Sequence, residues 1–226
     1  MAKKIYISPS SQPANTYAYG NTNEQEQCRK IAAALEKELD RCGFDSKAGL
    51  SGTMYTRTAD SNAFGADLHL PIHTNACNGK VAGLRIMVYK KGGEAEKIAK
   101  AIDAELAPIT PGTSDGISEY PGLYEIKNSK AVCVYIEVGF HDNKEEAKWI
   151  IDHTNDIAVA IAKGLCKHYG VKYVADVDKP AATKPAESDV FYRVQVGAFD
   201  SKANAENMKK RLKAAGFEGF IVEVKK

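Results

Sequence analysis

Lys4-Ile-Tyr-Ile7, near the start of this 226-residue chain, is the segment from which its fold class can be predicted. This apolar strand leads through a loop of Ser, Pro, Asn and Gly residues into a helix expected over residues 22–42, which Gly43 closes. A strand followed directly by a helix is the typical opening of an α/β fold. The rest of the chain can therefore be searched for further strands that alternate with helices.

Apolar runs at residues 68–72 and 131–136 are typical of central strands, whereas residues 83–89 alternate more between apolar and polar side chains. Residues 94–106 and 143–169 carry helical periodicity. The pattern predicts an α/β fold with a mixed, mostly parallel sheet covered by helices on both faces. Ligands of such sheets bind outside the carboxyl ends of the strands.

Composition excludes several classes of protein. Hydrophobic residues make up 44% and charged residues 27% of the chain, which is ordinary for a globular protein and excludes disordered and fibrous ones. The net charge of +2 gives no reason to expect binding to nucleic acid or to an acidic membrane. No apolar stretch approaches the ~20 residues that span a bilayer, and the start lacks a signal-peptide pattern. We expect a soluble chain that is made in the cytoplasm.

Glu24 is the first candidate site residue. It lies in the first turn of the predicted helix, on the same face as Cys28, Ile31 and Leu35. A carboxylate in line with a buried stripe is expected to be paired, neutralised or bound to a cation, because an unpaired buried charge is costly. The alternative is that Glu24 lies at the surface and complements the helix dipole.

The second candidate is His73, in Asp67-Leu-His-Leu-Pro-Ile-His-Thr-Asn75, where it stands at the carboxyl end of a buried strand. The alternative is that His73 is a hydrogen-bonded residue of the core without a role in chemistry. His69 lies about 13 Å away along a regular strand, so we expect it to pack within the sheet.

The third candidate segment is Tyr135-Ile-Glu-Val-Gly-Phe-His-Asp-Asn143. It places Glu137 at the carboxyl end of an apolar strand, His141 on the loop that follows, and Asn143 as a helix cap. Carboxylate and imidazole groups thus converge at one edge of the sheet, and these are the ligand types of a catalytic zinc site.

Together, Glu24, Ala66-Asp-Leu-His-Leu-Pro-Ile-His-Thr-Asn-Ala76 and Tyr135-Ile-Glu-Val-Gly-Phe140 resemble the zinc-dependent type 3 N-acetylmuramoyl-L-alanine amidases over residues 3–170. Arg57 and Asn62 also match the family's Arg/Asn pattern. The resemblance implies a six-stranded sheet with helices on both sides. It also implies hydrolysis of the amide between the lactyl group of N-acetylmuramic acid and L-alanine in peptidoglycan.

Carried over to this chain, the resemblance implies one zinc ion per chain bound by Glu24 and His73, with Glu137 as the catalytic carboxylate. The family's first ligand is a histidine in a Gly-His-Gly loop, where this chain has Ser8-Pro-Ser-Ser-Gln12. We predict His141 as the third ligand, followed by His69 and Gln12, and the alternative role of His141 is to line the substrate groove. Gln12 and Asn75 are predicted to bind substrate.

The tail beyond the Pro- and Ala-rich residues 178–188 resembles a sporulation-related repeat (SPOR) module. The pattern Phe191-Tyr-Arg-Val-Gln-Val-Gly-Ala-Phe199 predicts a strand, followed by a helix and a second strand over 219–224. The resemblance implies binding to glycan strands stripped of their peptides. Because about one βα repeat is recognisable, we predict a partial module that pairs with a second copy, giving a homodimer.

The predicted organisation is therefore a zinc amidase over residues 1–172, a linker over 173–189 and a partial SPOR-like βαβ module over 190–226. We expect the enzyme to act on the cell wall after release by host lysis, with phage and bacterial origin both open. Two alternatives stay open. One is a catalytically inactive wall-binding homologue without a complete zinc site. The other is an intracellular α/β protein unrelated to peptidoglycan.

Overall fold

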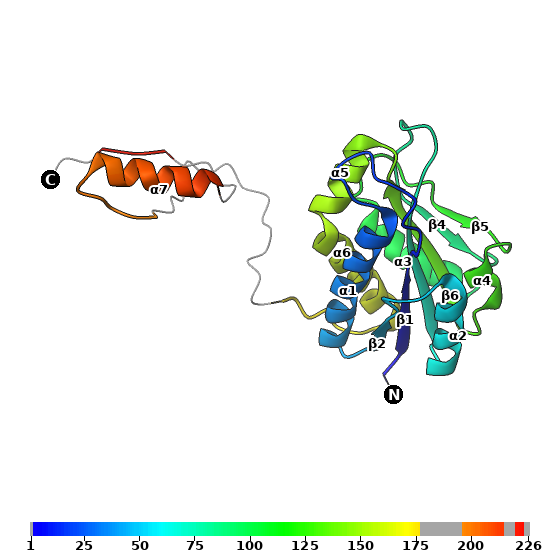
Figure 1. Ribbon diagram of the computed structural model, residues 1–226. Helices are drawn as coiled ribbons and strands as arrows, with labels where there is room; N and C mark the ends of the chain where they lie inside the picture. The colour runs from blue at the N-terminus through cyan, green and yellow to red at the C-terminus, as the bar shows by residue number, and fades with distance from the viewer. Residues whose placement is uncertain (1, 177–195, 215–219, 224–226) are drawn as a thin grey trace. The chain divides into compact units, whose positions relative to one another are not determined.

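The computed structural model describes residues 2–176, 196–214 and 220–223. The chain divides into two units, Met1–Val177 and Asp178–Lys226, and each is described by itself. The first unit contains the sheet and all helices up to Tyr169, as Figure 1 shows. Within the described part of the second unit there is one helix, α7 (Lys202–Ala214).

The first unit is built on a six-stranded sheet in the order β2-β1-β3-β6-β4-β5. Its strands are β1 (Lys4–Pro9), β2 (Asp45–Ala48), β3 (Leu68–Asn75), β4 (Arg85–Val88), β5 (Ile117–Glu119) and β6 (Val132–Phe140). All neighbouring pairs are parallel except β4 and β6, which run antiparallel. The predicted mixed, mostly parallel six-stranded sheet is confirmed.

Helices cover both faces of this sheet, as predicted. On one face lie α1 (Glu24–Arg41) and α3 (Glu94–Leu106), which contact the strands, and α6 (Thr154–Tyr169), which packs against both of these helices. On the other face lie α2 (Met54–Phe64) and the short α4 (Tyr124–Asn128), while α5 (Lys144–Asp152) follows β6. No helix among the described residues combines the length and apolar character that a membrane crossing requires.

The two faces of the sheet differ in chemistry, because successive side chains of a strand point to opposite sides. The face toward α1, α3 and α6 is the apolar core, to which β1, β3 and β6 contribute aliphatic side chains (Ile5, Ile7, Leu68, Leu70, Ile72, Val134, Ile136 and Val138). The intervening positions point to the opposite face and are largely polar or aromatic (Tyr6, Ser8, His69, His73, Tyr135 and Glu137). We call this second side the polar face.

The helical periodicity over residues 143–169 is confirmed, and it is divided between two helices, α5 and α6. The break is at His153, whose φ of −114° and ψ of 22° are not helical. Its Nδ1 lies 2.9 Å from the Trp149 carbonyl oxygen, and its ring stacks on the Trp149 ring. Thr154 then begins α6, with its hydroxyl bonded to the carbonyl oxygens of Ile150 and Ile151. Local contacts of side chains thus override a periodicity that continues across the break.

The tail is only partly described. Of the first predicted tail strand, only Val196 and the residues after it lie among the described residues, and the second is described at Phe220–Glu223, where no strand is assigned. The linker prediction over 173–189 lies outside the described residues beyond Asp176. The predicted tail helix corresponds to α7.

Candidate active site

A buried carboxylate–imidazole pair joins the start of α1 to the end of β3. Glu24 Oε1 lies 2.9 Å from His73 Nδ1, and both side chains are buried. Asn23 caps α1, and Asn15 Nδ2 donates to the second oxygen of Glu24 at 2.6 Å. Burial alone would raise the pKa of Glu24, but hydrogen bonds with His73 and Asn15 outweigh it and lower that pKa. Glu24 is therefore a charged group held in place for His73.

Glu137 is the register neighbour of His73 on the adjacent strand β6. Immediately after this pair the register of β3 and β6 shifts, so that Asn75 pairs with Phe140. Glu137 Oε2 is buried and has no hydrogen-bond partner among the described residues. Burial raises the pKa of Glu137 to about 7, with His73 opposing the shift and Glu24 adding to it. A carboxyl group in this state can take up and release a proton near neutral pH.

His73 is surrounded by carboxylates. Burial disfavours its charged form, but the nearby carboxylate of Glu125, the hydrogen bond with Glu24 and the negative charge of Glu137 together raise the pKa of His73 to about 9. Its ring also stacks on Tyr135, with the centroids 4.6 Å apart. The site thus holds more negative charge than one imidazole neutralises, a property that favours a bound cation.

Gln12 is the predicted alternative ligand that the structure places beside this pair. Its Nε2 lies 3.4 Å from His73 Nδ1, and its backbone N–H lies 3.3 Å from the Ser10 hydroxyl oxygen. Ser11 and Gln12 line a pocket of about 390 Å³ together with His73 and residues of α2 and α4 (Thr53, Met54, Tyr55, Leu123, Tyr124, Glu125 and Tyr135). The pocket therefore opens over the polar face, between the two helices that cover it.

His141 and Asn75 occupy other surroundings. His141 Nδ1 lies 3.0 Å from the Thr74 carbonyl oxygen and 3.1 Å from the Thr74 hydroxyl, and its ring stacks on Tyr17. The Asn75 side chain accepts a hydrogen bond from the Ala76 backbone, and the Asn75 carbonyl accepts one from His141. No contact with Glu24 or His73 is recorded for either side chain, and their predicted roles stay predictions.

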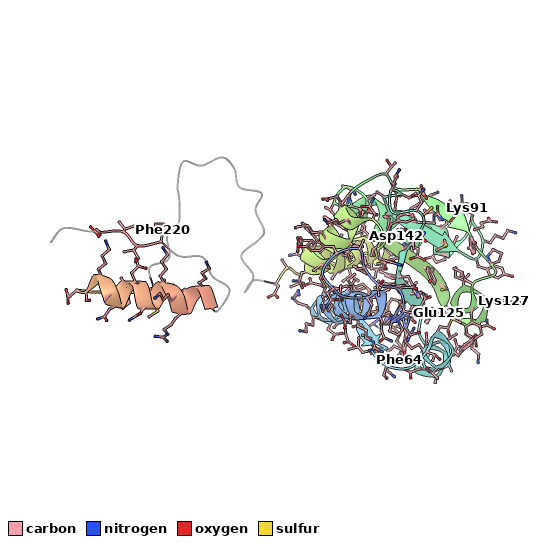
Figure 2. The ribbon with its side chains drawn as sticks, turned by 45° about the horizontal axis from the view of Figure 1, so that its top comes forward. Phe64, Lys91, Glu125, Lys127, Asp142 and Phe220 are labelled. Atoms are coloured by element: carbon pink, nitrogen blue, oxygen red, sulfur yellow. The ribbon has the colours of Figure 1, made fainter. Side chains whose placement is uncertain are left out.

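Glu125 is the site residue that the sequence did not reveal. It comes from α4 and is buried, and Figure 2 shows it inside the first unit. Glu125 Oε2 lies 3.7 Å from His73 Nε2, and Glu125 Oε1 lies 3.2 Å from His69 Nε2. A single carboxylate therefore reaches both histidines of β3. Nothing in the local pattern Leu123-Tyr-Glu-Ile126 distinguishes this carboxylate from a surface one.

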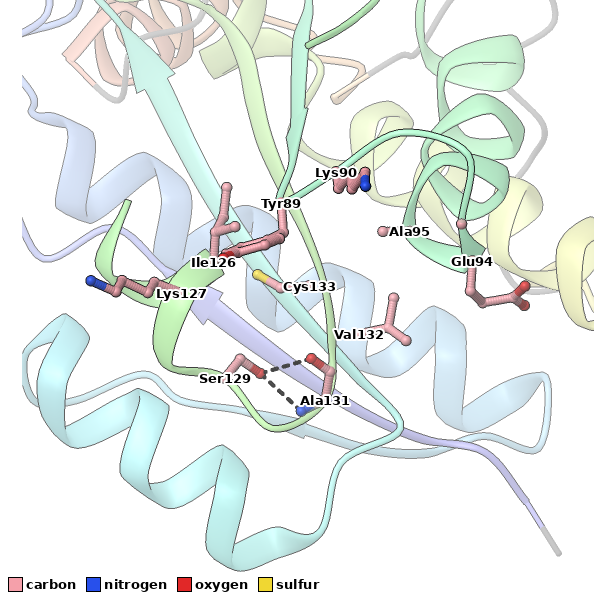
Figure 3. A pocket seen from close by; sticks show the side chains of 11 residues that line it. Tyr89, Lys90, Glu94, Ala95, Ile126, Lys127, Ser129, Ala131, Val132 and Cys133 are labelled. Atoms are coloured by element: carbon pink, nitrogen blue, oxygen red, sulfur yellow. Dashed lines mark hydrogen bonds between the residues drawn. The ribbon is translucent and has the colours of Figure 1, made fainter. Parts of the chain in front are cut away.

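A second pocket, of about 370 Å³, lies elsewhere, between the loop before α3 and the start of β6. Figure 3 shows Tyr89, Lys90, Lys127 and Cys133 around it. None of the groups just described lines this pocket, so the chemistry belongs to the pocket at His73.

The donors at His73 provide part of what a zinc ion requires. In the part of the chain that the structure describes, no group of three or more His, Cys, Asp or Glu side chains is arranged to hold a metal. Glu24 and His73 nevertheless supply one oxygen and one nitrogen donor, and rotation of the neighbouring Gln12 amide would present a further oxygen. Together with the surplus negative charge, this set fits a divalent cation with two strong ligands and one weak one.

Comparison with protein families gives two matches. Residues 6–167 match the family described as N-acetylmuramoyl-L-alanine amidase, and residues 171–226 match the SPOR domain. Among known proteins, the chain is 27% identical over 226 residues to N-acetylmuramoyl-L-alanine amidase CwlM of Bacillus licheniformis, covering 97% of this chain and 84% of the relative.

Solved structures share the fold of the first unit. The catalytic domain of the N-acetylmuramoyl-L-alanine amidase CwlV from Bacillus (Paenibacillus) polymyxa var. colistinus superposes with a TM-score of 0.66 at 20% identity, covering 75% of this chain and 99% of that one. The catalytic domain of the CD27L endolysin targeting Clostridia Difficile gives a TM-score of 0.64 at 24% identity, over 73% of this chain and 97% of that one. At these identities the likeness shows the fold alone.

Proposed function

This chain belongs to the N-acetylmuramoyl-L-alanine amidase family, and we propose that it cleaves the amide between N-acetylmuramic acid and L-alanine of peptidoglycan with Glu137 as the base. The main support for the proposal is the environment of the Glu137 side chain. Its Oε2 atom is buried and has no partner among the described residues, and Glu137 pairs in register with His73 on the neighbouring parallel strand, beside the Glu24–His73 contact.

Zinc is the metal that we propose for this site. Glu24 and His73 would hold it, with Gln12 beside them as a weaker third donor. When bound, zinc supplies a Lewis acid for the amide carbonyl and makes a water molecule more acidic. His141, the third ligand predicted from the sequence, would have to give up its contacts with Thr74 to take part. Gln12 is therefore the better supported third donor.

Glu137 would move the protons of the reaction. With a pKa of about 7, it is partly ionised at neutral pH and can take the proton of the attacking water. The same carboxyl group then delivers that proton to the alanine nitrogen as the amide bond breaks. Tyr55 and Tyr124, whose rings meet at 4.5 Å, form one wall of the pocket and would orient the substrate beside Glu137.

The test is Glu137→Gln, which keeps the shape of the side chain and removes the base. We expect this variant to fold and bind zinc like the wild type but to release muropeptides at least ~10²-fold more slowly. Glu38→Gln is the matched control, because Glu38 is also buried but binds Arg41 and Tyr173 at the other end of α1. Release by Glu137→Gln at the rate of the control would assign the base to another residue.

The SPOR match supports a second part of the proposal, in which the tail binds glycan strands that the amidase has stripped of peptides. Basic residues of α7 would face the substrate carbohydrate and its anionic surroundings (Lys209, Lys210, Arg211 and Lys213). Action after host lysis stays a prediction.

An inactive wall-binding homologue is the second candidate function. It is favoured by Ser8-Pro-Ser-Ser-Gln12 in place of a Gly-His-Gly loop and by the lack, among the described side chains, of a ready three-ligand group. Elemental analysis combined with a wall-release assay separates the two candidates. The inactive homologue would sediment with cell walls, contain no zinc and release no peptides with or without chelator.

A further inference from the structure

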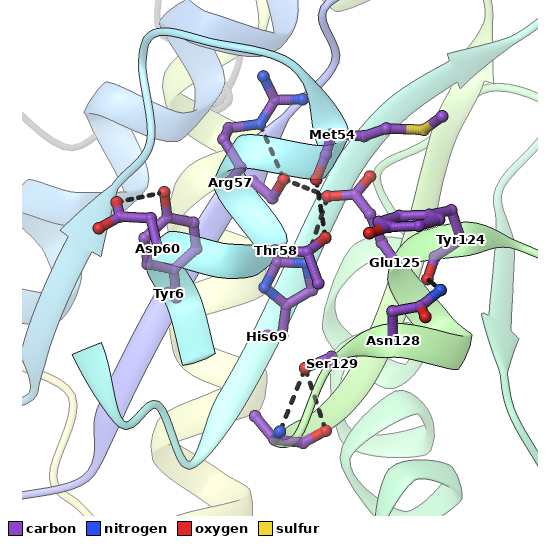
Figure 4. A network of polar contacts seen from close by, with 12 residues as sticks. Tyr6, Met54, Arg57, Thr58, Asp60, His69, Tyr124, Glu125, Asn128 and Ser129 are labelled. Carbon is purple, nitrogen blue, oxygen red and sulfur yellow. Dashed lines mark hydrogen bonds and ion pairs between the residues drawn. The ribbon is translucent and has the colours of Figure 1, made fainter. Parts of the chain in front are cut away.

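A chain of buried polar contacts behind His73 has no role in the reaction just described. Arg57 Nε donates to the Ser8 hydroxyl at 3.0 Å, and the Ser8 hydroxyl donates to Glu125 Oε1. His69 Nε2 lies 3.2 Å from the same Glu125 oxygen, as Figure 4 shows. Each of these four side chains is at most 2% exposed. They come from α2, β1, α4 and β3, so the fold assembles them from four separate elements.

The two oxygens of Glu125 have different partners. Oε1 receives Ser8 and His69, whereas Oε2 faces His73 Nε2 at 3.7 Å, within ion-pair range. His73 Nε2 is buried and makes no hydrogen bond with any described residue. Among the described residues, Glu125 Oε2 is the carboxylate oxygen that forms an ion pair with this nitrogen, so it is the acceptor available to an Nε2–H.

We propose that Glu125 is a positioning residue for His73: it accepts the Nε2–H of the ring and thereby keeps Nδ1 directed at Glu24, as the nitrogen that binds the metal. This inference rests on the proposed function, in which His73 is a ligand. An imidazole that binds a metal through one nitrogen usually donates the other N–H to a carboxylate or carbonyl, which fixes the tautomer and the ring orientation. Arg57 and Ser8 hold Glu125, and Glu125 holds the ring.

A purely structural role would be that Glu125 neutralises His69 and Arg57. Arg57 reaches Glu125 only through the Ser8 hydroxyl, and its NH1 donates to the Gly52 carbonyl at 2.7 Å. Ser8 and His69 both use Glu125 Oε1, which leaves Oε2 to face His73 Nε2 at 3.7 Å. Both roles contribute to stability, so the test needs readouts that stability alone does not change.

The experiment compares the full-length wild type with Glu125→Gln and with the control Glu38→Gln. The first readout is the long-range ¹H–¹⁵N spectrum of zinc-free protein. We expect the His73 Nε2–H signal to be protected from exchange in the wild type and the control, and to exchange at least ~10-fold faster in Glu125→Gln, because the charged acceptor is lost. The second readout is zinc affinity by chelator competition, which we expect to fall ~10- to 100-fold in Glu125→Gln and not in the control.

Equal signals and equal zinc affinity in Glu125→Gln and Glu38→Gln would overturn the proposal. If the wild type itself bound no zinc, the proposed metal chemistry would fail, while the imidazole signal of the zinc-free protein would still decide whether Glu125 positions His73. Should Glu125→Gln not fold, Ser8→Ala replaces it. That variant removes one of the contacts that hold Glu125 and is expected to change both readouts in the same direction by a smaller amount, and unchanged readouts would again count against the proposal.

Discussion

At the scale of single residues, the site depends on charges that stabilise one another inside the protein. His73 is the centre of this arrangement, with Glu24 on one ring nitrogen, Glu125 facing the other and Glu137 beside it on the next strand. A buried charge lacking such partners would be strongly destabilising. The stability of the zinc-free protein should therefore respond to the protonation of this one imidazole.

We predict that the zinc-free protein loses stability as the pH rises through about 9. The pKa of His73 is raised from 6.5 to about 9 in the folded protein, so its protonated form stabilises the fold fully below about 6.5, and this stabilisation is lost as the proton leaves near 9. Melting temperatures between pH 6 and pH 10 check this. His73→Gln should flatten the decline over that range, and an identical pH profile in the variant would contradict the prediction.

The sequence revealed some of these residues and not others, for a physical reason. Glu24 begins α1, and His73 and Glu137 lie in the carboxyl-terminal halves of β3 and β6, where the parallel direction of the two strands brings them together. Glu125 stands in a five-residue helix, 52 residues from His73 along the chain, and its burial depends on contacts that no local spacing encodes. Tertiary packing alone identifies it.

Some helices and strands could likewise be predicted from the sequence, and others could not. The central strands β3 and β6 could be predicted because the core side of each is an unbroken series of aliphatic residues. The strands β2 and β5 at the two edges of the sheet are short and carry few core side chains, and α4 has five residues, so none of them has a period long enough to detect. The site depends on this less predictable part, since α4 supplies Glu125.

At the scale of elements, the packing of α3 on α6 depends on Gly164. A Cβ at this position would lie 2.7 Å from the Ala101 carbonyl oxygen and from the Ile102 Cα, and both are backbone atoms. We predict that Gly164→Ala lowers the free energy of unfolding by about 1–3 kcal/mol, because the two helices must move apart. Urea denaturation measures this change.

Gly93→Ala is the control for that variant. Gly93 precedes α3 with an extended backbone conformation, and a Cβ there meets nothing within 4 Å. We expect its effect on the free energy of unfolding to stay within about 0.5 kcal/mol. Equal losses in the two variants would show that the close approach of α3 and α6 is not the cause.

At the scale of the whole molecule, the tail leaves apolar side chains exposed. Phe220 is 74%, Val196 60% and Val222 52% exposed, although the chain there belongs to a compact unit of its own. Exposed apolar surface of this kind favours association. We predict that the full-length chain sediments as a dimer at micromolar concentration and that a chain ending at Val177 sediments as a monomer. Monomers in both cases would contradict the prediction.

The opposite characters of the two sides of the sheet have a consequence for engineering and for evolution. Along β1, β3 and β6, alternate positions serve the core and the polar face separately, because Ile7 and Ile72 face the core while the adjacent Ser8 and His73 lie on the polar face. A library that randomises only the positions on the polar face would therefore sample new reactivities on a scaffold that keeps its shape, whereas one shifted by a single position would yield mostly insoluble variants.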